Sequence, residues 1–202
     1  SNAYRTTGVD ENIVNMTYKE VRRLDAGSWY SDEYKGEKVP GLREVLELAQ
    51  GKIKLNIELK PADNGEELAR KTVALIEKYN MENDCVITSF SSSALSAAKS
   101  CDENIRVGYI LSAAYGDYYD MKNIDFFSVN AAFLSKRTID AIHNSGKQVY
   151  AWTVNNKDSI KNLTNKGVDG VITDNPVLAR ETIYSRDTSE TIVNMIRYVF
   201  NQ

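Results

Sequence analysis

From Ile53 onward, short apolar runs alternate with segments in which apolar residues recur every three or four positions. The short runs are typical of buried β-strands, and the longer segments of helices that pack through one face. Six strands are predicted, at residues 53–59, 84–88, 106–111, 124–129, 147–153 and 169–173. Helices are predicted at residues 65–79, 92–100, 136–145, 157–166 and 176–185. Repeated strand–helix units indicate an α/β fold with a parallel sheet.

The boundaries of these helices carry capping signals. Gly146 and Gly167 each follow a predicted helix, where a glycine can adopt the left-handed conformation that ends it. Asn175 precedes Pro176, which predicts an N-cap followed by a first-turn proline. Within residues 65–79, one face is predicted to carry Leu68, Thr72, Leu75, Ile76 and Tyr79.

Two architectures fit this alternation: an open doubly wound sheet and a closed (β/α) barrel. A complete eight-unit barrel needs about 250 residues, whereas the present chain has 202. Residues 17–50 do not resemble two further units, because a short helix signal at 17–24 is followed by an aromatic, glycine-rich loop and a helix at 41–50. This region is predicted to be an insertion, so six strands are expected.

The first predicted strand alternates strictly between apolar and polar positions. Its apolar positions are Ile53, Leu55, Ile57 and Leu59, and its polar positions are Lys54, Asn56, Glu58 and Lys60. A half-solvated antiparallel strand would give the same pattern. In a parallel barrel the polar face would point inward, and Glu58 and Lys60 would lie at the carboxyl end, where active sites of that fold gather.

Four other residues fall at or just past predicted strand ends, namely Ser89, Asn130, Trp152 and Asp174. Each has an ordinary structural explanation as a cap, turn or core residue, and their common position at one rim is what favours a function. The single histidine, His143, lies in the last turn of a predicted helix. A positive charge is favourable there, so a structural or surface role is expected.

Composition excludes several classes of function. The net charge is −3 with no basic block, which argues against nucleic-acid binding. Two cysteines, Cys85 and Cys101, are too few for a disulfide framework. No apolar stretch approaches the ~20 residues of a membrane span, and a soluble domain is expected, with no prediction of its location in the cell. The first three residues, Ser1-Asn2-Ala3, are typical of an expression-tag remnant.

Three stretches resemble the glycerophosphodiester phosphodiesterase family: residues 24–60, with the Ala-Gly-Ser-Trp loop and the Asn-Ile-Glu-Leu-Lys strand, VYAWTVN at 149–155, and GVDGVITDNP at 167–176. Arg5-Thr6-Thr7-Gly8 is similar to the segment that follows that family's His-Asp motif. The resemblance implies an incomplete TIM (β/α) barrel with six of eight strands and a small insertion before the first strand present.

The same resemblance implies site residues and a cofactor. Glu58 matches one of three carboxylates that hold Ca²⁺ or Mg²⁺ in the intact domain, and Lys60 matches a lysine that offsets charge on the phosphate. Trp152 matches an aromatic residue near the substrate, and Arg5 is assigned to substrate binding. The implied reaction cleaves a glycerophosphodiester to glycerol 3-phosphate and an alcohol.

The chain departs from the family pattern in one respect that bears on activity. The family's His-Arg-Gly, Glu-x-Asp and His-Asp motifs, which carry the acid–base histidines and two metal ligands, have no counterpart in the 202 residues. Because one carboxylate is a poor site for a hard divalent ion, metal binding is expected to be weak or absent and the isolated chain inactive. A non-catalytic module that binds a phosphodiester or a partner is the alternative, and a different barrel enzyme using only Glu58 and Lys60 ranks last.

The resemblance also indicates how the chain is divided into domains. Together with the sequence patterns, it predicts one truncated barrel domain at 4–202 after the tag remnant at 1–3, with an insertion subdomain at 17–50, six βα units at 51–185 and a C-terminal helix at 186–202. Six strands would leave two open sheet edges, so either a homodimer or swapped assembly is expected to cover them, or the N-terminal segment or the tail after residue 186 does so. A membrane-anchored parent protein is a further expectation.

Overall fold

The structure, a computed structural model, describes residues 2–61, 64–113 and 118–184. The chain divides into two compact units, Ser1–Arg106 and Val107–Gln202. The C-terminal helix predicted at 186–202 lies outside the described residues. The predicted division into a tag remnant, an insertion and a single barrel domain stays a prediction.

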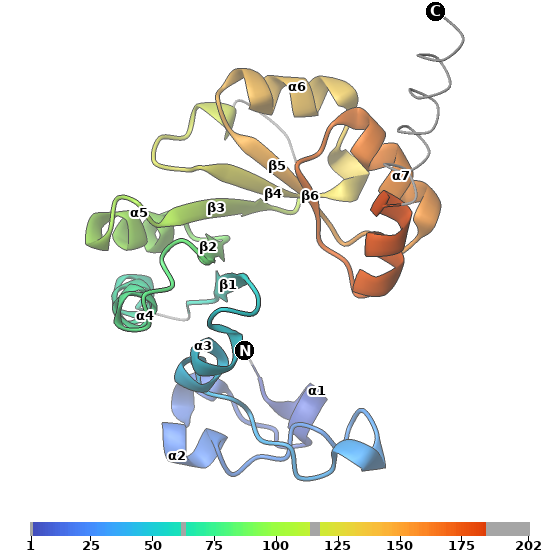
Figure 1. Ribbon diagram of the computed structural model, residues 1–202. Coiled ribbons are helices and arrows are strands. Elements are labelled where there is room, and N and C mark those ends of the chain that lie inside the picture. The colour runs from blue at the N-terminus through green and yellow to red at the C-terminus, as the bar shows by residue number, and fades with distance from the viewer. Residues whose placement is uncertain (1, 62–63, 114–117, 185–202) are drawn as a thin grey trace, which may run out of the picture. The chain divides into compact units, whose positions relative to one another are not determined.

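The first unit combines short helices, two strands and two longer helices (Figure 1). Its helices are α1 (Tyr4–Thr7), α2 (Tyr18–Val21), α3 (Leu42–Ala49), α4 (Gly65–Lys78) and α5 (Ser92–Cys101), with 3₁₀ turns at Ile13–Asn15 and Asp32–Tyr34. Its strands are β1 (Leu55–Leu59) and β2 (Cys85–Ser89), which pair in parallel with Glu58 opposite Thr88. Helices α4 and α5 pack against each other and α5 packs on β2.

The second unit contains the remaining strands, apart from the first residue of β3 (Figure 1). These strands are β3 (Arg106–Leu111), β4 (Phe126–Asn130), β5 (Gln148–Trp152) and β6 (Gly170–Val171), and each neighbouring pair is parallel. Helices α6 (Lys136–Asn144) and α7 (Lys157–Lys166) follow β4 and β5, 3₁₀ turns lie at Tyr118–Asp120 and Ala131–Phe133, and residues 176–184 are helical.

The strands follow one another in the order β1 to β6. This sequential parallel order, with helices between most strands, is that of a TIM (β/α) barrel rather than of a doubly wound sheet, whose strand order reverses. The six strands lie within one or two residues of their predicted positions at most boundaries, and the α/β fold class with six parallel strands is confirmed.

The capping predictions are also confirmed. Gly167 ends α7 in the left-handed conformation at φ 96°, and Gly146, just after α6, has φ 76°. The Asn175 side-chain oxygen accepts a hydrogen bond from the Leu178 backbone N–H at 3.1 Å, which is the N-cap expected before Pro176.

Two details of the predicted pattern are wrong. Strand β1 begins at Leu55, and Ile53 lies before it with 66% of its surface exposed, because the chain is still in the turn that follows α3. In α4, Leu68 is exposed while Ala69 and Val73 are buried. Thr72 and Ile76 of the predicted face are buried as expected, and α4 packs against α5.

The core of the second unit is built from both faces of its strands. Val149 and Ala151 share one face of β5 and are fully buried, and α6 packs against this strand (Figure 1). On the opposite face, the Phe126 and Tyr150 rings lie 4.6 Å apart between centroids. Gly108 of β3 is opposite Phe126 in the register, so the ring occupies the space that a side chain at Gly108 would fill.

We predict that Gly108→Ala destabilises the protein by about 1–3 kcal/mol, because the new β-carbon overlaps the fully buried Phe126 ring. Urea unfolding followed by circular dichroism measures the change. Gly65→Ala is the matched control, since its β-carbon would lie 3.2 Å from the nearest atom, Cβ of Pro61. Equal midpoints for Gly108→Ala and the wild type would contradict this packing.

Candidate functional site

The polar face of β1 presents an ion pair at the carboxyl end of the strand. The Lys60 ammonium nitrogen lies 3.4 Å from Oε2 of Glu58, and the two side chains are 65% and 34% exposed. The pair forms because Glu58 is directed away from the buried Leu59, and Lys60, two residues on, leaves the strand on the same side. The structure thus brings together two of the predicted site residues.

The neighbouring polar residues of the first unit are engaged in structural hydrogen bonds. The Thr88 hydroxyl donates to the Asn56 side-chain oxygen at 2.9 Å, which ties the polar faces of β1 and β2. The buried Ser89 hydroxyl donates to the Leu59 carbonyl at 2.8 Å and accepts from the Ser91 N–H at 3.0 Å. Ser89 is therefore a turn residue, which is the ordinary explanation given for it above.

A divalent cation does not fit the residues that the structure describes. Ca²⁺ and Mg²⁺ are held by several oxygen ligands. Among residues 2–61, 64–113 and 118–184, no three His, Cys, Asp or Glu side chains are grouped so that they could share an ion. Glu58 is a single carboxylate whose near partner is a positively charged lysine, so it supplies at most one ligand.

In the second unit, Trp152 and Asn130 lie opposite each other at the carboxyl ends of β5 and β4. The Trp152 indole N–H donates to the Ser128 carbonyl at 3.0 Å, which fixes the ring against the neighbouring strand. The Asn130 side-chain oxygen accepts from the Ala132 N–H at 3.0 Å and caps the short turn after β4. Trp152 is half-buried and held in place, whereas Asn130 has a local structural role.

Asn155 is a rim residue that the sequence patterns did not single out. Its amide nitrogen donates to the Asp174 carboxylate at 2.7 Å, while its side-chain oxygen accepts from the Asp174 N–H at 2.9 Å and from the Thr173 hydroxyl at 3.0 Å. These bonds join the segment after β5 to the segment after β6. The only sequence signal for Asn155 is its place at the end of the VYAWTVN stretch.

Arg5 lies on α1 with its guanidinium 5.2 Å from the centre of the Trp29 ring, a cation–π contact. It borders a hollow of about 380 Å³ together with Asn2, Tyr4 and Asp10. The predicted role of Arg5 in substrate binding stays a prediction, and what the structure adds is the contact with Trp29.

A single carboxylate organises the loop that carries Trp29. Oδ1 of Asp25 accepts from the Gly27 and Ser28 N–H groups at 2.9 and 3.0 Å, and Oδ2 accepts from the Ser28 hydroxyl at 2.8 Å and the Gly36 N–H at 2.9 Å. These donors, those of Ser28 foremost, hold the pKa of Asp25 well below its usual range. Residues 25–36 therefore form a closed loop around the Asp25 carboxylate.

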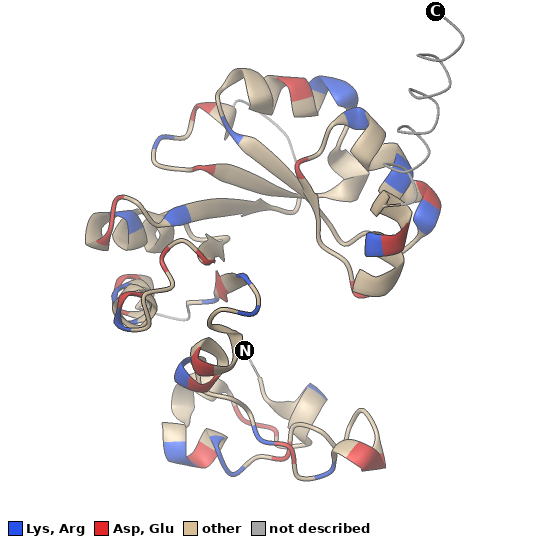
Figure 2. Cartoon of the chain, in the orientation of Figure 1, with Lys and Arg blue, Asp and Glu red and all other residues tan. Residues whose placement is uncertain are grey.

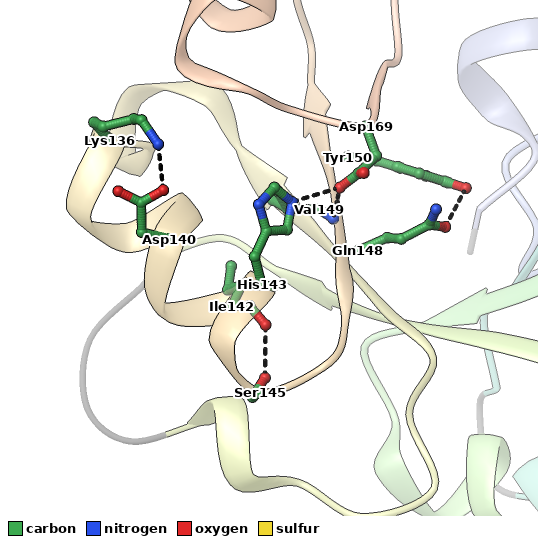
Figure 3. Close-up of polar contacts among 9 residues, drawn as sticks. All are labelled: Lys136, Asp140, Ile142, His143, Ser145, Gln148, Val149, Tyr150 and Asp169. Carbon is green, nitrogen blue, oxygen red and sulfur yellow. Dashed lines mark hydrogen bonds and ion pairs between the residues drawn. The ribbon is translucent and has the colours of Figure 1, made fainter.

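His143 lies away from the rim that holds Trp152. Its Nε2 atom is 2.9 Å from Oδ2 of Asp169, and the same Asp169 oxygen accepts from the Val149 N–H at 2.8 Å (Figure 3). Val149 is near the start of β5 and Asp169 precedes β6, so the pair joins α6 to the amino ends of these strands. The structural role expected for His143 agrees with this geometry.

The Tyr118 ring meets the ring of Phe127 edge-on, with 5.3 Å between the ring centroids. Charged residues of both signs are interspersed along the helices and loops in Figure 2. In the described part of the chain, no helix has the length and apolar character needed to cross a membrane.

A family model described as the glycerophosphoryl diester phosphodiesterase family matches residues 1–178. The chain belongs to this family. The resemblance inferred from residues 24–60, 149–155 and 167–176 is thereby confirmed, as is the phosphodiesterase class of hydrolase. Members of the glycerophosphoryl diester phosphodiesterase family are generally metal-dependent.

Individual relatives carry the same name. A glycerophosphodiester phosphodiesterase from Caldanaerobacter subterraneus subsp. tengcongensis is 27% identical over 96% of this chain and 76% of its own length. One from Bacillus altitudinis is 27% identical over 85% of this chain and 74% of its own. The structure of an Oleispira antarctica phosphodiesterase in complex with the product sn-glycerol-3-phosphate is 29% identical, covering 90% of this chain and 76% of that one, with a TM-score of 0.79.

We predict that Asp25→Asn weakens the loop of residues 25–36 and flattens its acid sensitivity. Because the folded pKa of Asp25 is depressed, its stabilising contribution is complete above the unfolded pKa of about 3.9 and is lost as the pH falls below it. Urea unfolding monitored by Trp fluorescence between about pH 6 and about pH 3 tests this. The control is Asp32→Asn, an exposed carboxylate of the same loop; equal slopes for both variants would contradict the role of Asp25.

Proposed function

We propose that this chain contributes the phosphate-facing part of a glycerophosphodiester phosphodiesterase site, with Glu58, Lys60, Arg5 and Trp152 as its functional residues. The supporting observation is the Glu58–Lys60 pair, 3.4 Å apart at the carboxyl end of β1. Active sites of TIM barrels lie at that end of the strands. The relative from Oleispira antarctica, described in complex with sn-glycerol-3-phosphate, supports a glycerol phosphate ligand.

Lys60 is the residue that offsets phosphate charge in this proposal. A phosphodiester anion repels nucleophiles, and a nearby ammonium group lowers that barrier by stabilising the charge that develops in the transition state. Exposed ion pairs are weak, so an ammonium group that is 65% exposed can exchange its contact with Glu58 for a phosphate oxygen.

Trp152 would pack against the glycerol part of the substrate. Its ring is fixed by the bond to the Ser128 carbonyl, and the Asn155 bonds to Thr173 and Asp174 hold the adjoining segment. A protein surface that is already fixed in this way loses little conformational entropy when a substrate binds to it. Arg5 would supply a second positive charge for the phosphate.

Proton transfer is the step for which the sequence places no histidine at this rim. An imidazole is the usual acid–base group near neutral pH. The single histidine of the sequence is His143, which is bonded to Asp169 at the amino ends of the strands, whereas Trp152 is at the carboxyl end of β5. We therefore propose that this chain by itself does not turn over glycerophosphodiesters.

The second candidate function is a module that binds a phosphodiester without cleaving it. The engaged His143 and the single carboxylate at Glu58 favour it, because binding an anion needs Lys60 and Arg5 but not a base or a metal. Binding of sn-glycerol 3-phosphate by the chain without any turnover of glycerophosphocholine is the result that supports this function.

A turnover assay of the chain with glycerophosphocholine is expected to show no release of glycerol 3-phosphate above background, with or without Ca²⁺ or Mg²⁺. The physical reason is the lack of an acid–base imidazole at the rim. Release that increases with enzyme and divalent ion, and that disappears in Glu58→Ala, would show that the proposal of inactivity is wrong.

Millimolar Ca²⁺ or Mg²⁺ is expected to leave the melting temperature of the chain unchanged, because ligand-linked stabilisation requires a site and Glu58 supplies one oxygen-donor side chain. Differential scanning calorimetry with each ion, and with EDTA as the reference, measures this. An increase of several degrees that is lost in Glu58→Ala, but kept in the surface variant Glu77→Ala, would contradict it.

We also propose that the open edges of β1 and β6 are covered by a second copy of the chain. In the described residues β1 pairs with β2 alone and β6 with β5 alone, and uncovered edge strands favour association. Multi-angle light scattering is expected to give the mass of a dimer, and a monomer at all concentrations would oppose the proposal. A membrane anchor on the parent protein stays a prediction.

A further inference from the structure

The loop between Asp25 and Glu37 exposes three aromatic side chains. Trp29, Tyr30 and Tyr34 have 52%, 71% and 43% of their surface in solvent. Contiguous exposed aromatic groups are uncommon on soluble proteins and mark binding sites more often than chance. The exposed ring faces are therefore the surface of this loop that a ligand could contact.

The rings meet by their edges rather than in a stack. The Trp29 and Tyr30 centroids are 5.8 Å apart with planes at 72°, and those of Tyr30 and Tyr34 are 5.6 Å apart with planes at 60°. A stacked pair covers one face of each ring, whereas an edge contact covers a face of only one of them. Ring faces carry the negative side of the aromatic quadrupole, so the uncovered faces attract cations.

The loop is held closed by its own hydrogen bonds. The four hydrogen bonds to the Asp25 carboxylate close it, and the Trp29 indole N–H donates to the Ala26 carbonyl at 2.9 Å. A ligand that binds here therefore meets rings whose positions are largely set, which lowers the entropic cost of binding.

The charges of the loop favour a positive ligand. Residues 25–37 include Asp25, Asp32, Glu33 and Glu37 but one positive residue, Lys35. In addition, the Arg5 guanidinium lies 5.2 Å from the Trp29 ring centre, so this aromatic ring already interacts with a cation from the chain itself. Four acidic residues against one lysine in residues 25–37 give the loop a negative charge that suits an organic cation.

We propose that the loop of residues 25–37 binds a quaternary ammonium group of the choline type through Trp29, Tyr30 and Tyr34. A trimethylammonium group is positively charged but has a methyl surface, so it can be taken up by ring faces without the strong hydration that an ammonium or metal ion would lose. The claim that this loop holds the alcohol group of a diester substrate rests on the proposed function. The claim that the loop binds the cation does not depend on that function.

The experiment titrates the full chain with choline chloride and, separately, with 3,3-dimethyl-1-butanol, the neutral molecule of the same shape. Saturation-transfer NMR on the ligand methyl groups gives the affinity of each. Choline is expected to bind in the millimolar range and at least several-fold more tightly than the neutral analogue. Equal affinities, or no choline binding at tens of millimolar, overturn the proposal.

Variants locate the site. Tyr30→Ala and Tyr34→Ala are each expected to weaken choline binding about two- to five-fold, the value of one exposed cation–π contact. Arg5→Gln is expected to strengthen it, because a competing positive charge leaves the Trp29 ring. The matched control is Tyr184→Ala, another exposed tyrosine with an arginine, Arg180, 5.6 Å from its ring centre. Unchanged affinity in both loop variants, with native circular dichroism, overturns the proposal.

The test of choline binding can be distinguished from the test of the proposed function. Lys60→Ala is expected to weaken binding of sn-glycerol 3-phosphate and to leave choline binding unchanged. A chain that binds sn-glycerol 3-phosphate through Lys60 but not choline overturns the cation site alone. A chain that binds choline but whose affinity for sn-glycerol 3-phosphate is the same in Lys60→Ala overturns the proposed function alone.

Discussion

Successive side chains of a β-strand point to opposite faces, so a parallel strand that is covered by helices on one face directs every second residue to the other. In β5 this rule buries Val149 and Ala151 and sends Tyr150 and Trp152 the other way. In β1 it buries Leu59 and presents Glu58. The helices that stabilise the sheet therefore also determine which side chains are left to contact a ligand.

The two ends of the strands use similar chemical groups for different purposes. At the carboxyl ends, the Glu58–Lys60 contact is long and exposed, and the half-buried Trp152 is held by its indole N–H. At the amino ends of β5 and β6, His143 and the Val149 N–H share one oxygen of Asp169. A histidine and a carboxylate committed to each other in this way join α6 to the sheet, and they are not a source of acid–base chemistry at the rim.

The loop of residues 25–37 combines a hydrogen-bonded carboxylate with aromatic side chains that stay in solvent. Burial of Trp29, Tyr30 and Tyr34 would be favourable by the area it removes from water. The hydrogen bonds to Asp25 instead close the chain into a loop whose interior is filled by backbone, since a side chain at Gly27 would collide with the backbone of Tyr34. On this closed loop Trp29, Tyr30 and Tyr34 remain 52%, 71% and 43% exposed.

Local periodicity and spacing were enough for the sequence to determine the six strands, most of the helices and their caps, and the pairing of Glu58 with Lys60 on one face of β1. These features depend on residues close together in the chain. The sequence did not reveal that Asn155 bonds Thr173 and Asp174, that Arg5 lies over Trp29, or that His143 meets Asp169. Only the tertiary structure decided these contacts, because each joins residues that are 18 or more positions apart and no local pattern encodes which long-range partner a polar or charged side chain will meet.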